Sequence, residues 1–350
     1  MSTRSSNRNS DHDPPASATC SGPGPLNRRA LLVGTGVVAA GLIGYPFVRR
    51  LFTAQKPVFL ARGQRYDGPL AQTIREGLVA VGLDPAGLRG RRVLLKPNLV
   101  EPLREAPHVT THPAVVLAAA DVFRGWGAEV LVGEAPGHIR DTELALAESG
   151  MGAALQSEKI PFVDFNYSEV RSVPNAGRLS RIDEFYFPCE LLEVDLIVSM
   201  PKLKTHHWVG FTAALKNLYG TLPGLVYGWP KNVLHYAGIP QTVVDINASL
   251  PRTIALVDGI LCMEGDGPIM GTPKHLGLLA VGLNPTAVDA TLARITGFDP
   301  RRVPYLAMAE GKLGPIAPRA ITQRGERWQE LVDPFTIIDA SHLQPMRATV

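Results

Sequence analysis

The sequence predicts an α/β fold in which a mainly parallel, doubly wound sheet carries helices on both faces, with one smaller irregular insertion. Two observations support this prediction. From about Gln55 onward, apolar runs of strand length alternate with segments of helical periodicity, which is typical of βαβ units. The strand runs are apolar at nearly every position, as strands buried on both faces of a parallel sheet require. We therefore expect a single α/β domain over residues 55–345 and a separate leader over residues 1–54.

The first half of the domain supplies three strands, at residues 92–95, 128–132 and 194–200. After Thr111-His112-Pro113 we expect a helix through Arg124, because proline is favoured in the first helical turn and Gly125 can end the helix. Asp141 can cap a second helix that ends at Gly150. Residues 162–188 are less regular, and we predict that they form an insertion or an antiparallel edge.

The second half continues the alternation of strands and helices. We expect helices over residues 210–219, 241–250 and 285–295, the last one opened by Asn284-Pro285. Strands are expected over residues 253–257 and 275–281. No internal repeat and no long linker interrupts this pattern, which favours one domain.

Composition narrows the class of protein. With 45% hydrophobic and 19% charged residues, the 350-residue chain has globular usage. Its net charge is only +3 and the domain has no long basic run, so a nucleic acid partner is not expected. Outside the leader, which contains Cys20, the cysteines are Cys189 and Cys262. They could form one disulfide or stay as buried thiols, but they are too few for a typical iron–sulfur cluster.

The leader has the features of a targeting segment. Arg28-Arg29 precedes an uncharged, glycine-rich apolar stretch at residues 30–48. This arrangement resembles a twin-arginine signal, although Asn27 and Leu31-Leu32 stand where the consensus has Ser or Thr and Phe-Leu. An ordinary membrane anchor is the alternative. No clean cleavage site follows, so the segment could remain as a tether.

We therefore expect recognition by the twin-arginine export machinery and a location in the periplasm or on the extracytoplasmic face of the membrane. Residues 30–48 would supply the contact with the membrane.

Four polar motifs directly follow predicted strands. In doubly wound folds, ligands bind beyond the carboxyl ends of the strands, so these motifs are expected to meet in one crevice. The motifs are Lys96-Pro97-Asn98, Gly133-Glu134 with Pro136-Gly137, Pro201-Lys202-Leu203-Lys204-Thr205-His206, and Asp258-Gly259 leading to Glu264-Gly265-Asp266-Gly267-Pro268.

The lysines in and near these motifs suit an anionic ligand, since an ammonium group on a flexible stem binds phosphate or carboxylate as a point charge. The expected substrate-binding residues are Lys96, Asn98, Lys202, Lys204, Lys216 and Asn217. For the last two, Lys216 and Asn217, the alternative is a helix end capped by Gly220.

The acidic residues suit proton transfer or a divalent metal. The expected catalytic residues are Glu134, His206, Asp258 and Glu264, with His206 as a proton carrier near neutral pH. The expected metal ligands are Asp258, Glu264 and Asp289, and for Asp289 the alternative is a buried salt bridge with Arg294 or Arg301. His112, His235 and His275 are predicted to be structural.

Taken in order, these motifs resemble a bacterial and archaeal family known only as domain of unknown function 362. The resemblance covers about residues 94–289. Its matching residues are Lys96-Pro97-Asn98, Thr111 with Pro113, Gly133-Glu134 with Pro136-Gly137, Pro201-Lys202 with Lys204-Thr205-His206, Lys216-Asn217 with Gly220, and Asp258 with Glu264-Gly265, Gly267-Pro268 and Gly271. Many members carry an added cysteine-rich ferredoxin-like module, which this sequence lacks, so an iron–sulfur cluster within this chain is not expected. The family name implies no reaction.

Two hypotheses of function follow. The first is an exported enzyme that acts on a small molecule bearing phosphate or carboxylate, with lysines binding the anion and carboxylates holding a metal or moving a proton. The second is a noncatalytic extracytoplasmic anion-binding protein or a membrane-associated redox partner. The sequence shows no P-loop, nucleophile elbow, zinc signature or glycine-rich dinucleotide fingerprint.

Overall fold

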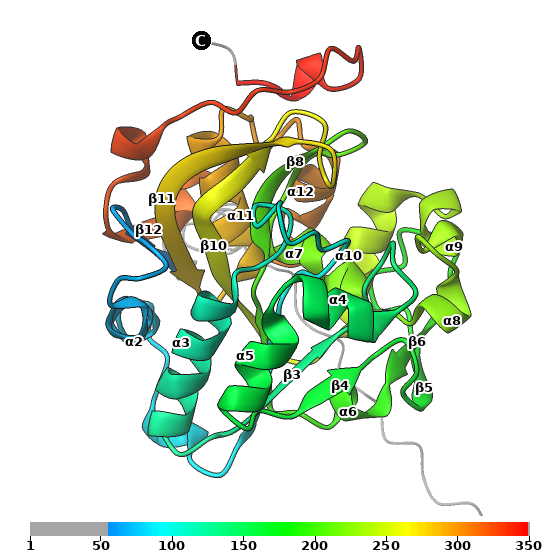
Figure 1. Ribbon diagram of the computed structural model, residues 1–350. Helices are drawn as coiled ribbons and strands as arrows, with labels where there is room; N and C mark the ends of the chain where they lie inside the picture. Colours follow the sequence, from blue (N-terminus) through cyan, green and yellow to red (C-terminus); the bar gives the residue numbers. More distant parts are fainter. Residues whose placement is uncertain (1–54, 349–350) are drawn as a thin grey trace, which may run out of the picture. The chain divides into compact units, whose positions relative to one another are not determined.

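The computed structural model describes residues 55–348, and these residues form a layered α/β structure around one large sheet (Figure 1). The predicted twin-arginine motif and the apolar stretch at residues 30–48 lie outside the described residues. In order across the main sheet, the strands are β12 (Ile321–Gly325), β1 (Lys56–Ala61), β11 (Thr272–Gly282), β10 (Thr253–Glu264), β7 (Leu196–Ser199), β2 (Arg92–Lys96), β3 (Glu129–Glu134) and β4 (Phe162–Asp164).

The sheet is mainly parallel, as the sequence predicted. β10, β7, β2, β3 and β4 run parallel to one another, and β1 and β12 form a second parallel pair. Only β11 in this row is antiparallel to its neighbours, β1 and β10. β10 and β11 are both long, and the loop of residues 265–271 connects them directly, which an antiparallel pair permits.

Helices cover both faces of the sheet, which confirms the doubly wound arrangement (Figure 1). Val93 and Leu95 belong to one core, while Leu94 between them belongs to the other, because successive side chains of a strand point to opposite faces. On the first face lie α2 (Leu70–Ala80), α3 (Pro113–Gly125), α4 (Thr142–Glu148) and α5 (Met151–Ser157). On the second face lie α7 (Ala214–Asn217), α10 (Ile239–Ser249), α11 (Pro285–Ile295) and α12 (Pro304–Ala309).

The irregular segment at residues 162–188 divides into two parts. β4 extends the main sheet in parallel, and β5 (Val170–Pro174) pairs with β6 (Glu184–Pro188) as a separate antiparallel hairpin. The carboxylate of Asp245 on α10 holds the hairpin loop, because it accepts hydrogen bonds from the backbone N–H groups of Leu179 at 2.9 Å and Ser180 at 2.7 Å.

Two sequence predictions were wrong, both near the polar motifs. The loop expected after β7 is a buried strand, β8 (Lys202–His206), which pairs with β10 and with β9 (Gly210–Thr212). Residues 210–219 do not form one helix; they contain β9, the short helix α7 and the start of a 3₁₀ turn at Leu218–Thr221. The reason is strand pairing. β8 pairs with the distant strand β10 and, across a short turn, with β9, and this pairing overrides the local helical pattern.

The remaining short helices lie between these elements or follow β6. They are α6 (Cys189–Leu192), α8 (Gly224–Tyr227) and α9 (Asn232–Tyr236). In the part of the chain from residue 55 to 348, no helix has both the length and the apolar character needed to cross a bilayer. Cys189 and Cys262 are free thiols rather than a disulfide, and of the two only Cys262 is fully buried.

Candidate functional site

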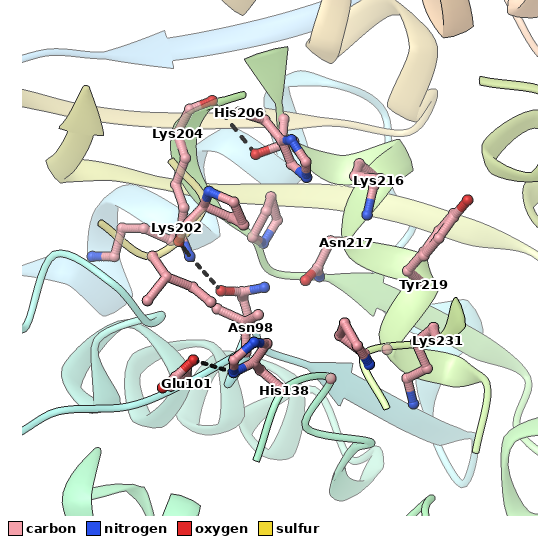
Figure 2. Close-up of a pocket in the computed structure, with 18 of the residues that line it drawn as sticks. Asn98, Glu101, His138, Lys202, Lys204, His206, Lys216, Asn217, Tyr219 and Lys231 are labelled. Carbon is pink, nitrogen blue, oxygen red and sulfur yellow. Dashed lines mark hydrogen bonds and ion pairs between the residues drawn. The ribbon is translucent and has the colours of Figure 1, made fainter. Parts of the chain in front are cut away.

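A cavity of about 420 Å³ lies beyond the carboxyl ends of β2, β3 and β7, with β8 and α7 forming further walls (Figure 2). This is where ligands bind in doubly wound folds. Seven of the residues that the sequence singled out lie on its wall: Asn98, Glu134, Lys202, Lys204, His206, Lys216 and Asn217.

Beneath the cavity, Lys96 and Glu134 form a buried ion pair across neighbouring parallel strands, here called the β2–β3 ion pair. Both side chains are almost completely inaccessible to solvent. Burial lowers the pKa of Lys96 and raises the pKa of Glu134, and each partner's charge opposes that effect on the other. Gly220 allows this packing, because a Cβ atom there would lie 2.0 Å from a carboxylate oxygen of Glu134.

A second buried pair, the β8–β10 ion pair, joins Lys202 to Asp258 at 2.6 Å. The Tyr66 hydroxyl completes it by accepting a hydrogen bond from Lys202 at 2.8 Å and donating one to Asp258 at 3.1 Å. The backbone N–H of His112 also donates to Asp258, at 3.0 Å. The charge of Lys202 is therefore paired within the protein, and Asp258 does not line the cavity.

Three further lysines on the cavity wall have no carboxylate partner among residues 55–348. They are here called the unpaired lysines: Lys204, Lys216 and Lys231. Lys204 donates a hydrogen bond to the amide oxygen of Asn98 at 2.9 Å and to the carbonyl of Pro268 at 3.2 Å. Lys204 and Lys231 are buried and Lys216 is half-buried, and none of the three has an acidic partner among the described residues.

Because these lysines lack a counter-charge, their pKa values are lowered. Burial, reinforced by the charge of Lys96, lowers the pKa of Lys216 to about 7. Burial likewise lowers the pKa of Lys231 to about 7, although Glu134 opposes the change. Burial and the neighbouring ammonium groups of Lys202 and Lys216 hold the pKa of Lys204 well below its ordinary value. A bound anion would relieve all three.

His206 differs from its predicted role as a proton carrier near neutral pH. Its Nδ1 accepts a hydrogen bond from the backbone N–H of Trp208 at 3.1 Å, so the neutral ring carries its proton on Nε2. Burial, together with the charge of Lys216, holds the pKa of His206 well below its ordinary value. His206 is therefore a neutral hydrogen-bond donor at neutral pH.

The carboxylates predicted to bind a metal are not assembled into one site. Glu264 accepts a hydrogen bond from the backbone N–H of Thr336 at 2.8 Å, and Asp258 belongs to the β8–β10 ion pair. Asp289 accepts hydrogen bonds from the backbone N–H groups of Ala214 and Leu215, at 2.8 and 2.9 Å. In the described part of the chain, no three His, Cys, Asp or Glu residues come together as ligands.

The alternative proposed for Asp289, a salt bridge with an arginine, is wrong as well. Arg294 donates to backbone carbonyls of Ala290 and Ile316, and Arg301 pairs with Asp299. Burial raises the pKa of Asp289 to about 7, and its two backbone donors oppose that change. Asp289 is instead an anchor for the first turn of α7, the helix that carries Lys216.

Sequence reasoning missed several residues of the site. Lys231 lies in the irregular connection between α8 and α9, with a positive φ of 70°, where no periodicity marks it. His235 lines the cavity although it was predicted to be structural, and burial lowers its pKa to about 4. Trp208 and Tyr219 supply aromatic wall. The sequence marks Trp208 and Tyr219 only by their position, since each lies close to one of the lysine motifs.

Comparison with known proteins identifies the family. The family described as a domain of unknown function, DUF362, matches residues 93–294, more than half of the chain. The chain belongs to this family. A DUF362 relative in sequence is the thylakoid-associated protein sll1697 of Synechocystis sp., which is 31% identical over 269 residues that cover 74% of this chain and 80% of the relative.

A solved structure shows a faint likeness to this DUF362 protein. It is the lactate racemase apoprotein from Thermoanaerobacterium thermosaccharolyticum, with a TM-score of 0.42 and 13% sequence identity. The match covers 66% of this chain and 54% of the racemase chain, so this chain spans about half the length of the racemase. A likeness this weak carries no inference about activity.

Proposed function

We propose that this DUF362 protein is an enzyme whose cavity binds a small organic anion bearing phosphate or carboxylate groups. The observation that carries the proposal is the convergence of the three unpaired lysines on one cavity. A buried ammonium group without a counter-charge costs several kcal/mol, about the cost of breaking a buried ion pair. When an anion binds, it supplies the missing counter-charge and removes this energetic cost, so the empty site is suited to anion binding.

The balance of charge favours a ligand with more than one negative charge. The β2–β3 and β8–β10 ion pairs each cancel internally, so they attract no further anion. The unpaired lysines leave a surplus of positive charge inside the cavity. At the rim, the carboxylates of Asp266 and Glu101 each lie beside a histidine, 3.3 Å from His207 and 2.5 Å from His138 respectively.

The remaining walls favour an organic ligand over a bare inorganic ion. Apolar surface comes from Trp208, Tyr219, Ile269 and Met270. The volume of about 420 Å³ lies within the range typical of small-molecule sites. Lys204 and Lys231 would bind the anionic groups, and Nε2–H of His206 would donate to a further oxygen. Lys216, whose pKa is near neutrality, would exchange a proton with the substrate.

Sulfate titration of the full chain by calorimetry tests the anion site. We expect saturable binding that weakens about tenfold to a hundredfold in Lys204→Met, because a hydrogen bond to a charged group contributes about 1.5–3 kcal/mol. Lys312→Met is the matched control, since Lys312 is exposed and does not line the cavity. Equal affinity in wild type and Lys204→Met would contradict the assignment. Binding of phosphate- and carboxylate-bearing compounds without turnover of any would favour a noncatalytic binding protein.

We further propose that the protein works at a membrane after export. Two observations support this: Arg28-Arg29 precedes the apolar stretch at residues 30–48, and the Synechocystis relative is described as thylakoid-associated. Replacing both arginines by alanine should leave the protein in the cytoplasm, and cell fractionation measures this. Equal distribution of wild type and variant between cytoplasm and membrane would contradict export by this route.

A further inference from the structure

Lys216 differs from the other unpaired lysines in having no fixed partner. Lys204 and Lys231 both donate hydrogen bonds to oxygens of the protein. The Lys216 amine makes no hydrogen bond or ion pair with any residue in the described part of the chain, and it lies 3.7 Å from the centre of the Tyr219 ring. Figure 2 shows it directed into the cavity. Its nitrogen is therefore accessible to a ligand.

The backbone that carries Lys216 is held firmly on both sides. Asp289 binds the N–H groups of the two residues that precede it, as described above. The amide of Asn217, the next residue, donates to the carbonyl of Lys96 at 3.0 Å and to the Ser199 hydroxyl at 3.1 Å. A reactive group on a rigid element is positioned in advance, which lowers the entropic cost of reaction.

The surroundings of Lys216 also favour the neutral, nucleophilic amine. Burial and Lys96 lower its pKa to about 7, so about half of the amine is unprotonated at neutral pH. The Tyr219 ring, 3.7 Å away, opposes this shift, because the face of an aromatic ring favours the ammonium form. An ordinary lysine has on the order of one free amine in a thousand at this pH. Desolvation beside another cation is a known way to activate a lysine nucleophile.

We propose that Lys216 is a covalent nucleophile that forms an imine with an aldehyde or ketone group of the anionic substrate. This proposal rests on the proposed function, since the anionic groups of that substrate would be held by Lys204 and Lys231. The Nζ lone pair attacks the carbonyl carbon, and the carbonyl π electrons move to oxygen. Both amine protons then leave with that oxygen as water, so no oxidant or reductant is needed.

The substrate class is therefore a 2-oxo acid or a phosphorylated aldehyde or ketone. The imine nitrogen then takes up a proton from water and becomes an iminium group. This group withdraws electrons from the bonds next to the former carbonyl carbon, which makes a neighbouring proton or carboxylate easier to remove. Nε2–H of His206, on the same cavity wall, would donate a hydrogen bond to the departing oxygen. An arginine at position 216 would keep the positive charge but would not form this imine.

Chemical trapping tests the proposal. The full chain is incubated with glyoxylate or glyceraldehyde 3-phosphate in the presence of cyanoborohydride, which reduces an imine to a stable secondary amine. Peptide mass mapping should find the adduct on Lys216, with sulfate competing against its formation. The adduct should be lost in Lys216→Arg and unchanged in Lys312→Met. Its rate should rise with pH around a midpoint near 7. The titratable groups that face Lys216 are Tyr219, Lys96, Lys204, Glu134, His206 and His235.

Two results would overturn the imine: no adduct on Lys216 with either probe, or an adduct spread evenly over exposed lysines such as Lys312. Sulfate titration separates this failure from that of the proposed function. If wild type and Lys216→Arg both bind sulfate while no adduct forms, Lys216 is only an anion-binding cation and the proposed function stands. If wild type binds neither sulfate nor glyoxylate nor glyceraldehyde 3-phosphate, the proposed function fails together with the imine.

Discussion

The affinity of the cavity for sulfate should fall as the pH rises above about 7. In the empty cavity, burial lowers the pKa values of Lys216 and Lys231 to about 7. A bound dianion stabilises their ammonium forms, so the pKa values rise in the complex and binding takes up protons. Sulfate keeps the same charge across this range, which leaves the protein as the titrating partner. Below the pKa of the empty site both lysines are already charged, and affinity stays at its maximum.

The size of the effect follows from linkage. Uptake of one proton lowers affinity by at most about tenfold per pH unit, or about 1.4 kcal/mol. From about pH 7 to about pH 9, each lysine that takes up a proton accounts for up to about a hundredfold, so Lys216 and Lys231 together account for up to about ten thousandfold. Lys204, whose pKa burial and the neighbouring lysines also lower, acts in the same direction. His235, with a pKa of about 4, and His206, whose pKa is well below its ordinary value, stay neutral over this range. They therefore do not contribute.

Calorimetry in buffers of different ionisation enthalpy measures both affinity and proton uptake. Lys216→Met should bind sulfate more weakly below pH 7 and show a shallower pH dependence, since one of the titrating lysines is gone. Lys312→Met should reproduce the wild-type curve. An affinity that stays flat from about pH 6 to about pH 9, with no proton uptake, would refute the reasoning that the empty cavity holds partly neutral lysines.

Three substitutions test the supports of the site. Gly220→Ala should destabilise the protein by about 1–3 kcal/mol, because the added Cβ meets the β2–β3 ion pair; an unchanged urea midpoint would contradict this. Asp289→Asn leaves the N–H of Leu215 without an acceptor, so we expect a loss of about 1–3 kcal/mol on urea unfolding, and a stability equal to wild type would remove its anchoring role. Tyr66→Phe removes the hydroxyl that bonds to Asp258 and should cost about 1–3 kcal/mol of unfolding free energy in thermal denaturation, with an unshifted melting temperature as the contrary result.

Helices whose ends are set by local contacts were the easiest to predict. Asp141 accepts a hydrogen bond from the N–H of Leu144 at 3.0 Å, and Asn284 accepts one from Ala287 at 3.0 Å. Both caps join residues three positions apart, so the sequence displays the whole interaction. The helix over residues 285–295 accordingly begins and ends where it was predicted.

Elements set by distant contacts were not predictable in the same way. β8 contains two lysines and was expected to be a loop, yet each of its residues is buried. It is a strand because Lys202 lies opposite Asp258 in the β8–β10 register and is neutralised there. Lys216 was expected in a regular helix. It lies instead in the short helix α7, whose first turn is held by hydrogen bonds from its backbone to Asp289 on α11.

The sequence by itself determined the α/β class, the alternation of strands and helices, and the gathering of polar motifs after strands. Apolar periodicity and capping are local, and the geometry of parallel strands brings their carboxyl ends to one edge. Only the tertiary structure decided which lysines are neutralised. The partners in the β2–β3 and β8–β10 ion pairs lie 38 and 56 positions apart in the chain, and Lys231 reaches the same cavity from an irregular segment. Charge pairing depends on distance in space, so the surplus charge that suits the cavity to an anion exists only in the folded chain.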